Sequence, residues 1–223
     1  MSSKSKAFIG IIYRLYNSGA TDKIVVAIDN KGSRLAMLAK GARKSSSKKS
    51  SYLEIGNYVK GSIIDGYAIP ILNEVTVINE FSLWKKNVNG AIAIQFVCEI
   101  IDKFCIEDHE DLKLFNVFHD VLKRFDDNRL KMLLSIFCLK ILDISGHTPE
   151  SAQLDFANDS NENSRIIKTQ KFILNSPVEL SIKVNLQPSE QEKMLQLHMH
   201  LIEEILEYPL KSRKILFNIM KIK

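Results

Sequence analysis

Short apolar runs rich in Ile, Val and Tyr, bounded by polar residues, occupy the first third of the chain and predict β-strands. Turn-forming residues separate the runs, and Asn30-Lys31-Gly32 favours a hairpin between the second and third. We expect five strands, over residues 7–15, 23–29, 34–39, 58–65 and 69–78. Five short strands in sequence are typical of a small barrel, and five is the strand count of the OB-fold.

The hydrophobic period becomes helical after Ser82. We expect helices over about 92–104, 112–125, 130–144, 191–206 and 210–220. The segment 130–144 is apolar on nearly every side, so this helix should be central and buried. The pattern predicts an α+β chain with two domains, an OB-fold barrel over residues 1–80 and a mainly helical domain over 81–223.

A different pattern interrupts the helical domain between residues 151 and 187. Residues 157–164 are polar apart from Ala157 and predict a loop. Two β-like runs follow, 172–174 and 178–186, separated by a turn at Asn175-Ser176-Pro177. Apolar residues occupy every second position of the later run. We therefore expect a loop and a small β-hairpin here.

Positive charge is concentrated near the start of the chain. Residues 1–60 hold 12 Lys and Arg against 3 Asp and Glu, a net charge of +9. The remaining residues hold 19 against 23, a net charge of −4. This asymmetry favours a basic module with a polyanionic partner and a second module with a different task.

Five cations cluster directly after the third predicted strand. The residues are Lys40, Arg43, Lys44, Lys48 and Lys49. Gly and Ser surround them and no carboxylate occurs until Glu54, so we expect a flexible, uncompensated cationic loop. An isolated run of this kind is more often a solvated surface loop. On a basic β module, however, it predicts contact with nucleic acid.

Few other chemistries are indicated. Cys98, Cys105 and Cys138 form no CxxC pair, which favours a reducing compartment and small core residues. The N-terminal residues lack an apolar signal core and no long apolar stretch occurs, so we expect a cytoplasmic protein without a membrane partner. Because GxSxG, P-loop and HExxH motifs are absent, we expect no catalytic residues, no cofactor and no metal.

Several ordered segments together resemble the bacterial DNA repair protein RecO family of recombination mediators. The segments are Gly10-Ile11-Ile12-Tyr13-Arg14, Gly19-Ala20-Thr21-Asp22-Lys23-Ile24-Val25, Ala39-Lys40-Gly41-Ala42-Arg43-Lys44, Phe137-Cys138-Leu139-Lys140-Ile141-Leu142, Ser145-Gly146-His147-Thr148-Pro149 and Leu210-Lys211-Ser212-Arg213-Lys214. The sequence departs from the family in lacking the zinc cysteines that many members carry just after the position of Pro149. It is therefore interpreted as a zinc-less member.

The resemblance implies a function in DNA repair and homologous recombination. Family members bind single- and double-stranded DNA and anneal complementary strands. With RecR they help to load RecA onto DNA coated by single-stranded DNA-binding protein, whose C-terminal tail they bind. For this chain it implies a cytoplasmic, nucleoid-associated protein that contacts RecA only indirectly.

The resemblance also implies site residues. By the resemblance, Lys40, Arg43 and Lys44 would face nucleic acid. Lys48 and Lys49 extend this patch, Arg34 and Lys6 join it where their strands face the same way, and Tyr52 is a candidate for stacking on a base. Tyr13, Tyr16, Tyr58 and Tyr67 are the other stacking candidates, and Tyr52 ranks first because it follows the cations. The partner-binding candidates are Lys140, Lys211, Arg213 and Lys214.

Three alternatives to the mediator function stay open. The first is an OB-fold RNA-binding or translation-associated module. A preference for structured RNA over single-stranded DNA in a binding competition would favour it. The second is a structural adaptor whose nucleic-acid affinity would not depend on the cationic loop. An enzyme is the last alternative, because no catalytic constellation is present in the sequence.

Overall fold

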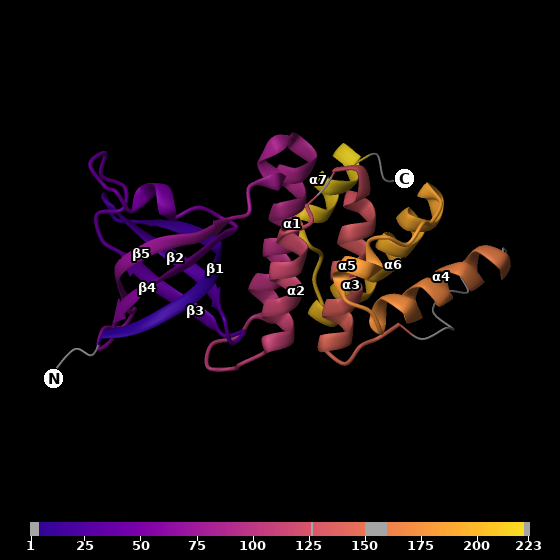
Figure 1. The fold of residues 1–223 in the computed structure, drawn as a ribbon, viewed down its shortest axis with the longest axis horizontal. Coiled ribbons are helices and arrows are strands. Elements are labelled where there is room, and N and C mark those ends of the chain that lie inside the picture. Colours follow the sequence, from indigo (N-terminus) through magenta and orange to yellow (C-terminus); the bar gives the residue numbers. More distant parts are fainter. Residues whose placement is uncertain (1–4, 126, 150–159, 221–223) are drawn as a thin grey trace. The chain divides into compact units, whose positions relative to one another are not determined.

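The computed structural model describes residues 5–125, 127–149 and 160–220 (Figure 1). The chain divides into two compact units. Unit 1 comprises Met1–Ser82 and Ile100–Asn116, and unit 2 comprises Leu83–Glu99 and Val117–Lys223. The first unit contains the β-structure, and the second is helical in its described residues.

Five strands close into a barrel in the order β1-β2-β3-β5-β4 (Figure 1). They are β1 (Ser5–Ser18), β2 (Asp22–Asp29), β3 (Arg34–Ala39), β4 (Asn57–Ile64) and β5 (Ile71–Glu80). The five predicted strands are thereby confirmed. All pairings are antiparallel except the closure between β3 and β5, where Leu38 is aligned with Ile71. The Leu38 amide reinforces this closure by donating to the Pro70 carbonyl at 2.8 Å.

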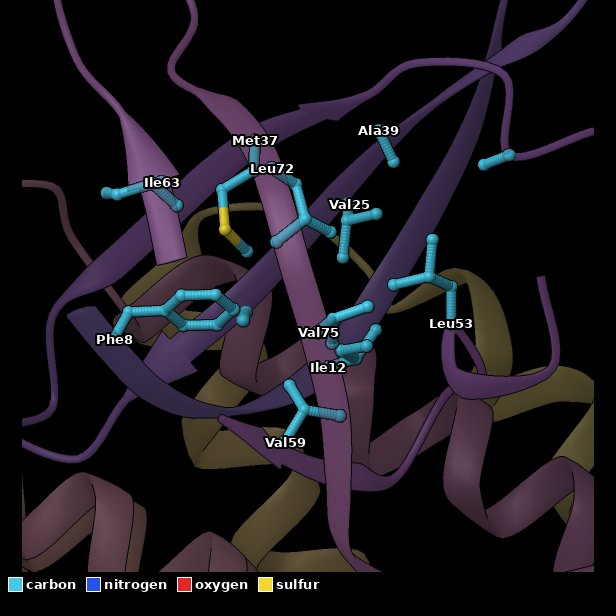
Figure 2. Packing of buried hydrophobic residues seen from close by; sticks show 12 residues of the cluster. Phe8, Ile12, Val25, Met37, Ala39, Leu53, Val59, Ile63, Leu72 and Val75 are labelled. Atoms are coloured by element: carbon cyan, nitrogen blue, oxygen red, sulfur yellow. The ribbon is translucent and has the colours of Figure 1, made fainter. Parts of the chain in front are cut away.

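Apolar residues from all five strands fill the barrel. Each strand contributes a side chain that is at most 1% exposed, and Figure 2 shows these side chains converging on the interior: Ile12, Val25, Met37, Val59 and Leu72. Burying each such side chain stabilises the fold by roughly 1.5–3 kcal/mol. In β2, Val25, Val26, Ala27 and Ile28 are all buried, so this strand is covered on both of its faces.

Residues of unit 1 beyond the barrel cover the turn between β2 and β3. The Arg34 amide donates to the Ile106 carbonyl at 3.0 Å, and the Lys31 ammonium pairs with Glu110 at 2.8 Å. Gly32 has φ +96°, and a Cβ there would lie 1.8 Å from the Asp111 carbonyl oxygen. This close approach requires glycine, because any side chain would collide with backbone.

Unit 2 is built from helices. Those described are η2 (Leu83–Lys86), α1 (Val88–Phe104), α2 (Leu112–Leu122), η3 (Asp127–Arg129), α3 (Leu130–Ile144), α4 (Ser160–Leu174), α5 (Val178–Ser181), α6 (Pro188–Leu206) and α7 (Lys211–Met220). The C-terminal end of α1 and the start of α2 belong to unit 1. Most of α3 is buried, as its apolar pattern predicts, and α4 and α6 pack against it. No helix in the described ranges has both the length and the apolar content to cross a lipid bilayer.

The predicted β-hairpin is wrong. Residues 172–174 end helix α4, and Val178–Ser181 form the short helix α5. Pro177 begins α5, and its carbonyl accepts the amide of Ser181 at 3.0 Å. Local helical hydrogen bonds therefore replace the strand that the alternating apolar residues predicted. The predicted loop is also wrong at residues 160–164, which are helical, whereas 151–159 lie outside the described residues.

Candidate nucleic-acid interface

The cationic segment between β3 and β4, here called the basic loop (residues 40–52), is a series of hydrogen-bonded turns. The Lys44 amide donates to Gly41 at 3.1 Å, the Ser47 amide to Lys44 at 2.9 Å, and the Ser50 amide to Ser47 at 3.3 Å. The short helix η1 (Ser50–Tyr52) ends the loop. These hydrogen bonds define the backbone path of the basic loop.

Apolar residues anchor the basic loop at both ends. Ala42, in the first turn, is fully buried, and Leu53, directly after the loop, is 1% exposed. Both belong to the barrel core, where Leu53 points inward in Figure 2. The basic loop is therefore held against the barrel near both of its ends.

Asp22, at the start of β2, fixes the first turn of the basic loop. Its Oδ1 accepts the Gly41 amide and the Thr21 hydroxyl, each at 2.8 Å. The Gly41 hydrogen bond, followed by that of Thr21, lowers the pKa of Asp22 below its usual value. Gly41 adopts φ +66°, a left-handed conformation that glycine tolerates best. Thr21 contributes again by accepting the Arg43 amide at 2.8 Å.

The five predicted cations of the basic loop differ in their surroundings. Lys40, Arg43, Lys44 and Lys48 are exposed, and the Arg43 guanidinium donates to the Gly19 carbonyl at 2.9 Å. Lys49 is half-buried and donates to backbone carbonyls of β5. Within the described ranges, none of the five forms an ion pair with a carboxylate. Four cations are therefore presented to solvent, and Lys49 secures the loop.

Two further cations predicted to contact nucleic acid are paired with carboxylates instead. The Arg34 guanidinium lies 2.6 Å from Asp102 Oδ1 and also donates to the Tyr13 hydroxyl at 2.9 Å. Lys6 pairs with Asp65 at 2.5 Å. Because these charges are compensated, they contribute less to an anion-binding surface than the basic loop does.

The tyrosine candidates separate by exposure. Tyr13 is 1% exposed and therefore part of the core, and Tyr58 is partly covered, with its ring centroid 6.1 Å from that of Phe115. Tyr16, Tyr52 and Tyr67 are 40%, 37% and 58% exposed. The predicted Tyr52 is thus accessible but is the least exposed of these three.

The predicted partner-binding cations in unit 2 do not share one environment. Lys140 donates to the Leu174 carbonyl at the end of α4 at 3.0 Å, and burial lowers the pKa of its ammonium. Arg213 pairs with Glu203 and lies over the Phe217 ring at 5.0 Å. Lys211 and Lys214 are exposed on α7. Among these four residues, only the side chains of Lys211 and Lys214 are therefore presented to solvent.

A buried polar cluster in unit 2 explains one of the histidines. His198 is fully buried, with Nδ1 3.1 Å from the Ser135 hydroxyl and Nε2 2.9 Å from the Gln170 amide nitrogen. Burial lowers the pKa of His198 to about 4. The cluster links α3, α4 and α6, so His198 has a structural role. In the described part of the chain, no three His, Cys, Asp or Glu side chains gather to hold a metal.

The exposed cations of the basic loop can neutralise phosphates without reading base identity. Ammonium and guanidinium groups on an ordered loop release condensed counterions when they meet a nucleic-acid backbone. The barrel with this loop and the separate helical unit define an α+β protein of two units, with the cationic surface on the β unit.

Comparison with known proteins identifies relatives of part of the chain. No family model matches the chain. The chain is 24% identical to the DNA repair protein RecO of Symbiobacterium thermophilum over 147 residues, which cover 64% of this chain and 57% of that protein. For the DNA repair proteins RecO of Dehalococcoides mccartyi and Listeria innocua, the identities are 26% and 23% over 141 residues, covering 63% of this chain and 56% and 55% of theirs.

The chain is thus similar to DNA repair proteins named RecO over about two thirds of its length. The chain spans little more than half the length of the relatives compared above. The predicted resemblance is thereby confirmed at the level of the family.

The residues that fix the basic loop carry no clear signal of this role in the sequence. Thr21 and Asp22 were part of a recognised segment, but only the structure brings them against Gly41. A Thr-Asp pair directly before a strand is a signal for local backbone hydrogen bonds, yet it does not indicate the partner. Asp102 lies 68 residues from Arg34 in sequence, so no local pattern could reveal that pair.

Proposed function

We propose that the chain acts in DNA repair and homologous recombination as a mediator that binds DNA through its basic loop. The observation that carries this proposal is the group of four exposed cations on an ordered loop, without carboxylate partners among the described residues. The names of the relatives as DNA repair proteins support the same function. We assign the barrel as an OB-fold, whose faces and loops commonly bind single strands.

The proposed mechanism is electrostatic. Phosphates of single- or double-stranded DNA meet the cations of the basic loop, and the released counterions supply the free energy of binding. Annealing of complementary strands then requires only that the protein neutralise two backbones, because base pairing provides the driving force. This activity needs no catalytic residue, cofactor or metal.

The helical domain, residues 81–223, is proposed to contact protein partners. The family resemblance suggests RecR and the acidic C-terminal tail of single-stranded DNA-binding protein, with RecA loaded indirectly. The exposed ammonium groups of Lys211 and Lys214 support contact with an acidic segment. Lys140 and Arg213 are engaged within unit 2 and would have to exchange their present partners. The proposed location is the nucleoid-associated cytoplasm.

A strand-annealing assay tests this function. Complementary oligonucleotides, bare or coated by single-stranded DNA-binding protein, are mixed with the wild-type chain and with a variant that carries Lys40→Ala, Arg43→Ala, Lys44→Ala and Lys48→Ala. The wild type should accelerate annealing and the variant should not. A Lys31→Ala variant is the matched control, since Lys31 is exposed on the same barrel but paired with Glu110.

Two results would contradict the proposal. Annealing that is equally fast with the quadruple variant would remove the basic loop from the mechanism. A wild-type chain that binds structured RNA in preference to single-stranded DNA would instead select the RNA-binding alternative.

A further inference from the structure

Tyr67 is the most exposed of the large apolar and aromatic side chains on the described surface of the barrel. It lies in the connection between β4 and β5, and 58% of its surface is accessible. An exposed tyrosine ring leaves a large apolar face in water, which costs free energy unless a ligand covers it. This ring is therefore accessible to a partner with a flat, apolar face.

The closure of the barrel places this connection beside the start of the basic loop. Leu38 pairs with Ile71 and donates to the Pro70 carbonyl at 2.8 Å, so the end of the connection is fixed against β3. Two residues after Leu38 the chain reaches Lys40, whose ammonium lies 5.8 Å from the centre of the Tyr67 ring. An aromatic ring and an exposed cation thus lie next to each other.

We propose that Tyr67 stacks on an unpaired nucleobase while Lys40 meets an adjacent phosphate. This inference rests on the proposed function and adds a specificity to it: the site selects strands with accessible bases. Every base offers a π-face to an aromatic ring, so the contact requires no particular sequence. In duplex DNA the bases are stacked on one another, and the ring has no base to contact.

The other exposed tyrosines are less suited to this contact. The guanidinium of Arg14 covers the Tyr16 ring at 4.9 Å, and Arg14 is itself held by an ion pair with Asp102. Tyr52 belongs to the short helix η1 and is 37% exposed, and its backbone carbonyl accepts a hydrogen bond from Asn57 Nδ2 at 3.0 Å. By contrast, Lys40 forms no ion pair within the described ranges, so its flexible side chain can move from the Tyr67 ring to a phosphate.

The experiment compares the affinity of Tyr67 variants for three 20-nucleotide probes by fluorescence anisotropy. The probes are a single strand of thymidines, the same backbone with abasic sites, and a duplex. Tyr67→Ala should weaken binding to the thymidine strand by about 5- to 150-fold and change duplex binding by less than about twofold. Tyr67→Phe should retain wild-type binding, because the ring rather than the hydroxyl makes the contact.

Two further readouts separate stacking from charge. Wild-type affinity for the abasic strand should fall to that of Tyr67→Ala for the thymidine strand. The salt dependence should be unchanged by Tyr67→Ala, whereas Lys44→Ala should make the slope of log affinity against log salt shallower by about 0.7. Tyr52→Ala serves as the matched control and should weaken single-strand binding by less than Tyr67→Ala does.

The outcomes distinguish this inference from the function on which it rests. One outcome is that the wild type binds all probes while Tyr67→Ala weakens single-strand and duplex binding equally, or weakens neither of them. The stacking contact is then wrong, but the proposal of DNA binding stands. If the wild type binds no probe at low salt, both proposals are wrong. Unchanged far-UV circular dichroism of Tyr67→Ala verifies that the exposed substitution leaves the fold intact.

Discussion

Removing the exposed cations of the basic loop should change how salt affects DNA binding. The sequence alone counts five cations, and five phosphate contacts predict a slope of log affinity against log salt near −3.5 for a single strand. The structure reduces that number, because the Lys49 ammonium already donates to the Leu72 and Asn73 carbonyls. Four exposed cations remain: Lys40, Arg43, Lys44 and Lys48.

The structure therefore predicts a slope of about −2.8. A fourfold increase in salt, from 50 to 200 mM, should then weaken single-strand binding by about 50-fold. Each alanine substitution among the four should reduce the magnitude of the slope by about 0.7. Substitution of all four should abolish this contribution. Lys49→Met keeps the apolar stem and should leave the slope unchanged.

The assay is a salt titration of single-strand binding, followed by fluorescence anisotropy in a monovalent salt. Lys31→Ala is again the control, because Lys31 is paired with Glu110 and should not contribute. A slope that the quadruple variant shares with the wild type would refute the reasoning. A slope that changes with Lys49→Met as much as with Lys44→Ala would refute the structural role given to Lys49.

Three other substitutions test the framework of the two units. Asp22→Ala should lower the melting temperature and weaken DNA binding, because the Gly41 amide loses its acceptor. Asp22→Asn keeps an acceptor oxygen and should retain the wild-type melting temperature and DNA affinity. Equal effects of the two substitutions would contradict the role of this hydrogen bond. Leu53→Ala should reduce the free energy of unfolding by about 3 kcal/mol in urea denaturation followed by circular dichroism, and a change below about 1 kcal/mol would show that the site is not core. His198 is neutral when folded, with a pKa of about 4, but protonates near pH 6.5 when unfolded, so the unfolded state binds more protons between these values. The free energy of unfolding of unit 2 should therefore fall by about 3 kcal/mol as the pH decreases through this window. Trp84 fluorescence during denaturation measures this change. The same decrease in His198→Gln would exclude His198 as the cause.

The barrel was predictable because each of its strands has one face in the core. The apolar runs that contain Val25 and Met37 indicate burial, and both side chains are fully buried. The order of strands in the closed barrel was harder to predict from the sequence, because closure depends on the single parallel pair of Leu38 with Ile71. Long-range closure leaves no periodic signal in either strand.

Helix α4 escaped prediction because its buried face is partly polar. Asn163, Ile166, Thr169, Gln170 and Ile173 are buried and follow helical spacing, but only the two isoleucines are apolar. Gln170 is buried because it meets His198, a partner from another helix. A hydrophobic pattern cannot identify a face whose polar groups are satisfied by a distant residue.

The candidate site was predictable in its charge but not in its arrangement. The run that contains Lys40 and Lys44 is visible in the sequence, and both side chains are exposed. The sequence could not show that Lys49 and Arg34 are already engaged within the fold. Their partners, the β5 carbonyls and Asp102, are brought close only by folding. Charge is a local property of the sequence, whereas compensation of charge is a property of the fold.

Lysine footprinting on the wild-type chain tests the central claim most directly. The protein is acetylated with an amine-reactive reagent in the presence and absence of a single-stranded oligonucleotide, and the reactivity of each lysine is read by mass spectrometry. The account predicts that DNA protects Lys40, Lys44 and Lys48, while Lys31 stays as reactive as in the free protein. Unchanged reactivity of these three lysines at saturating DNA would contradict it.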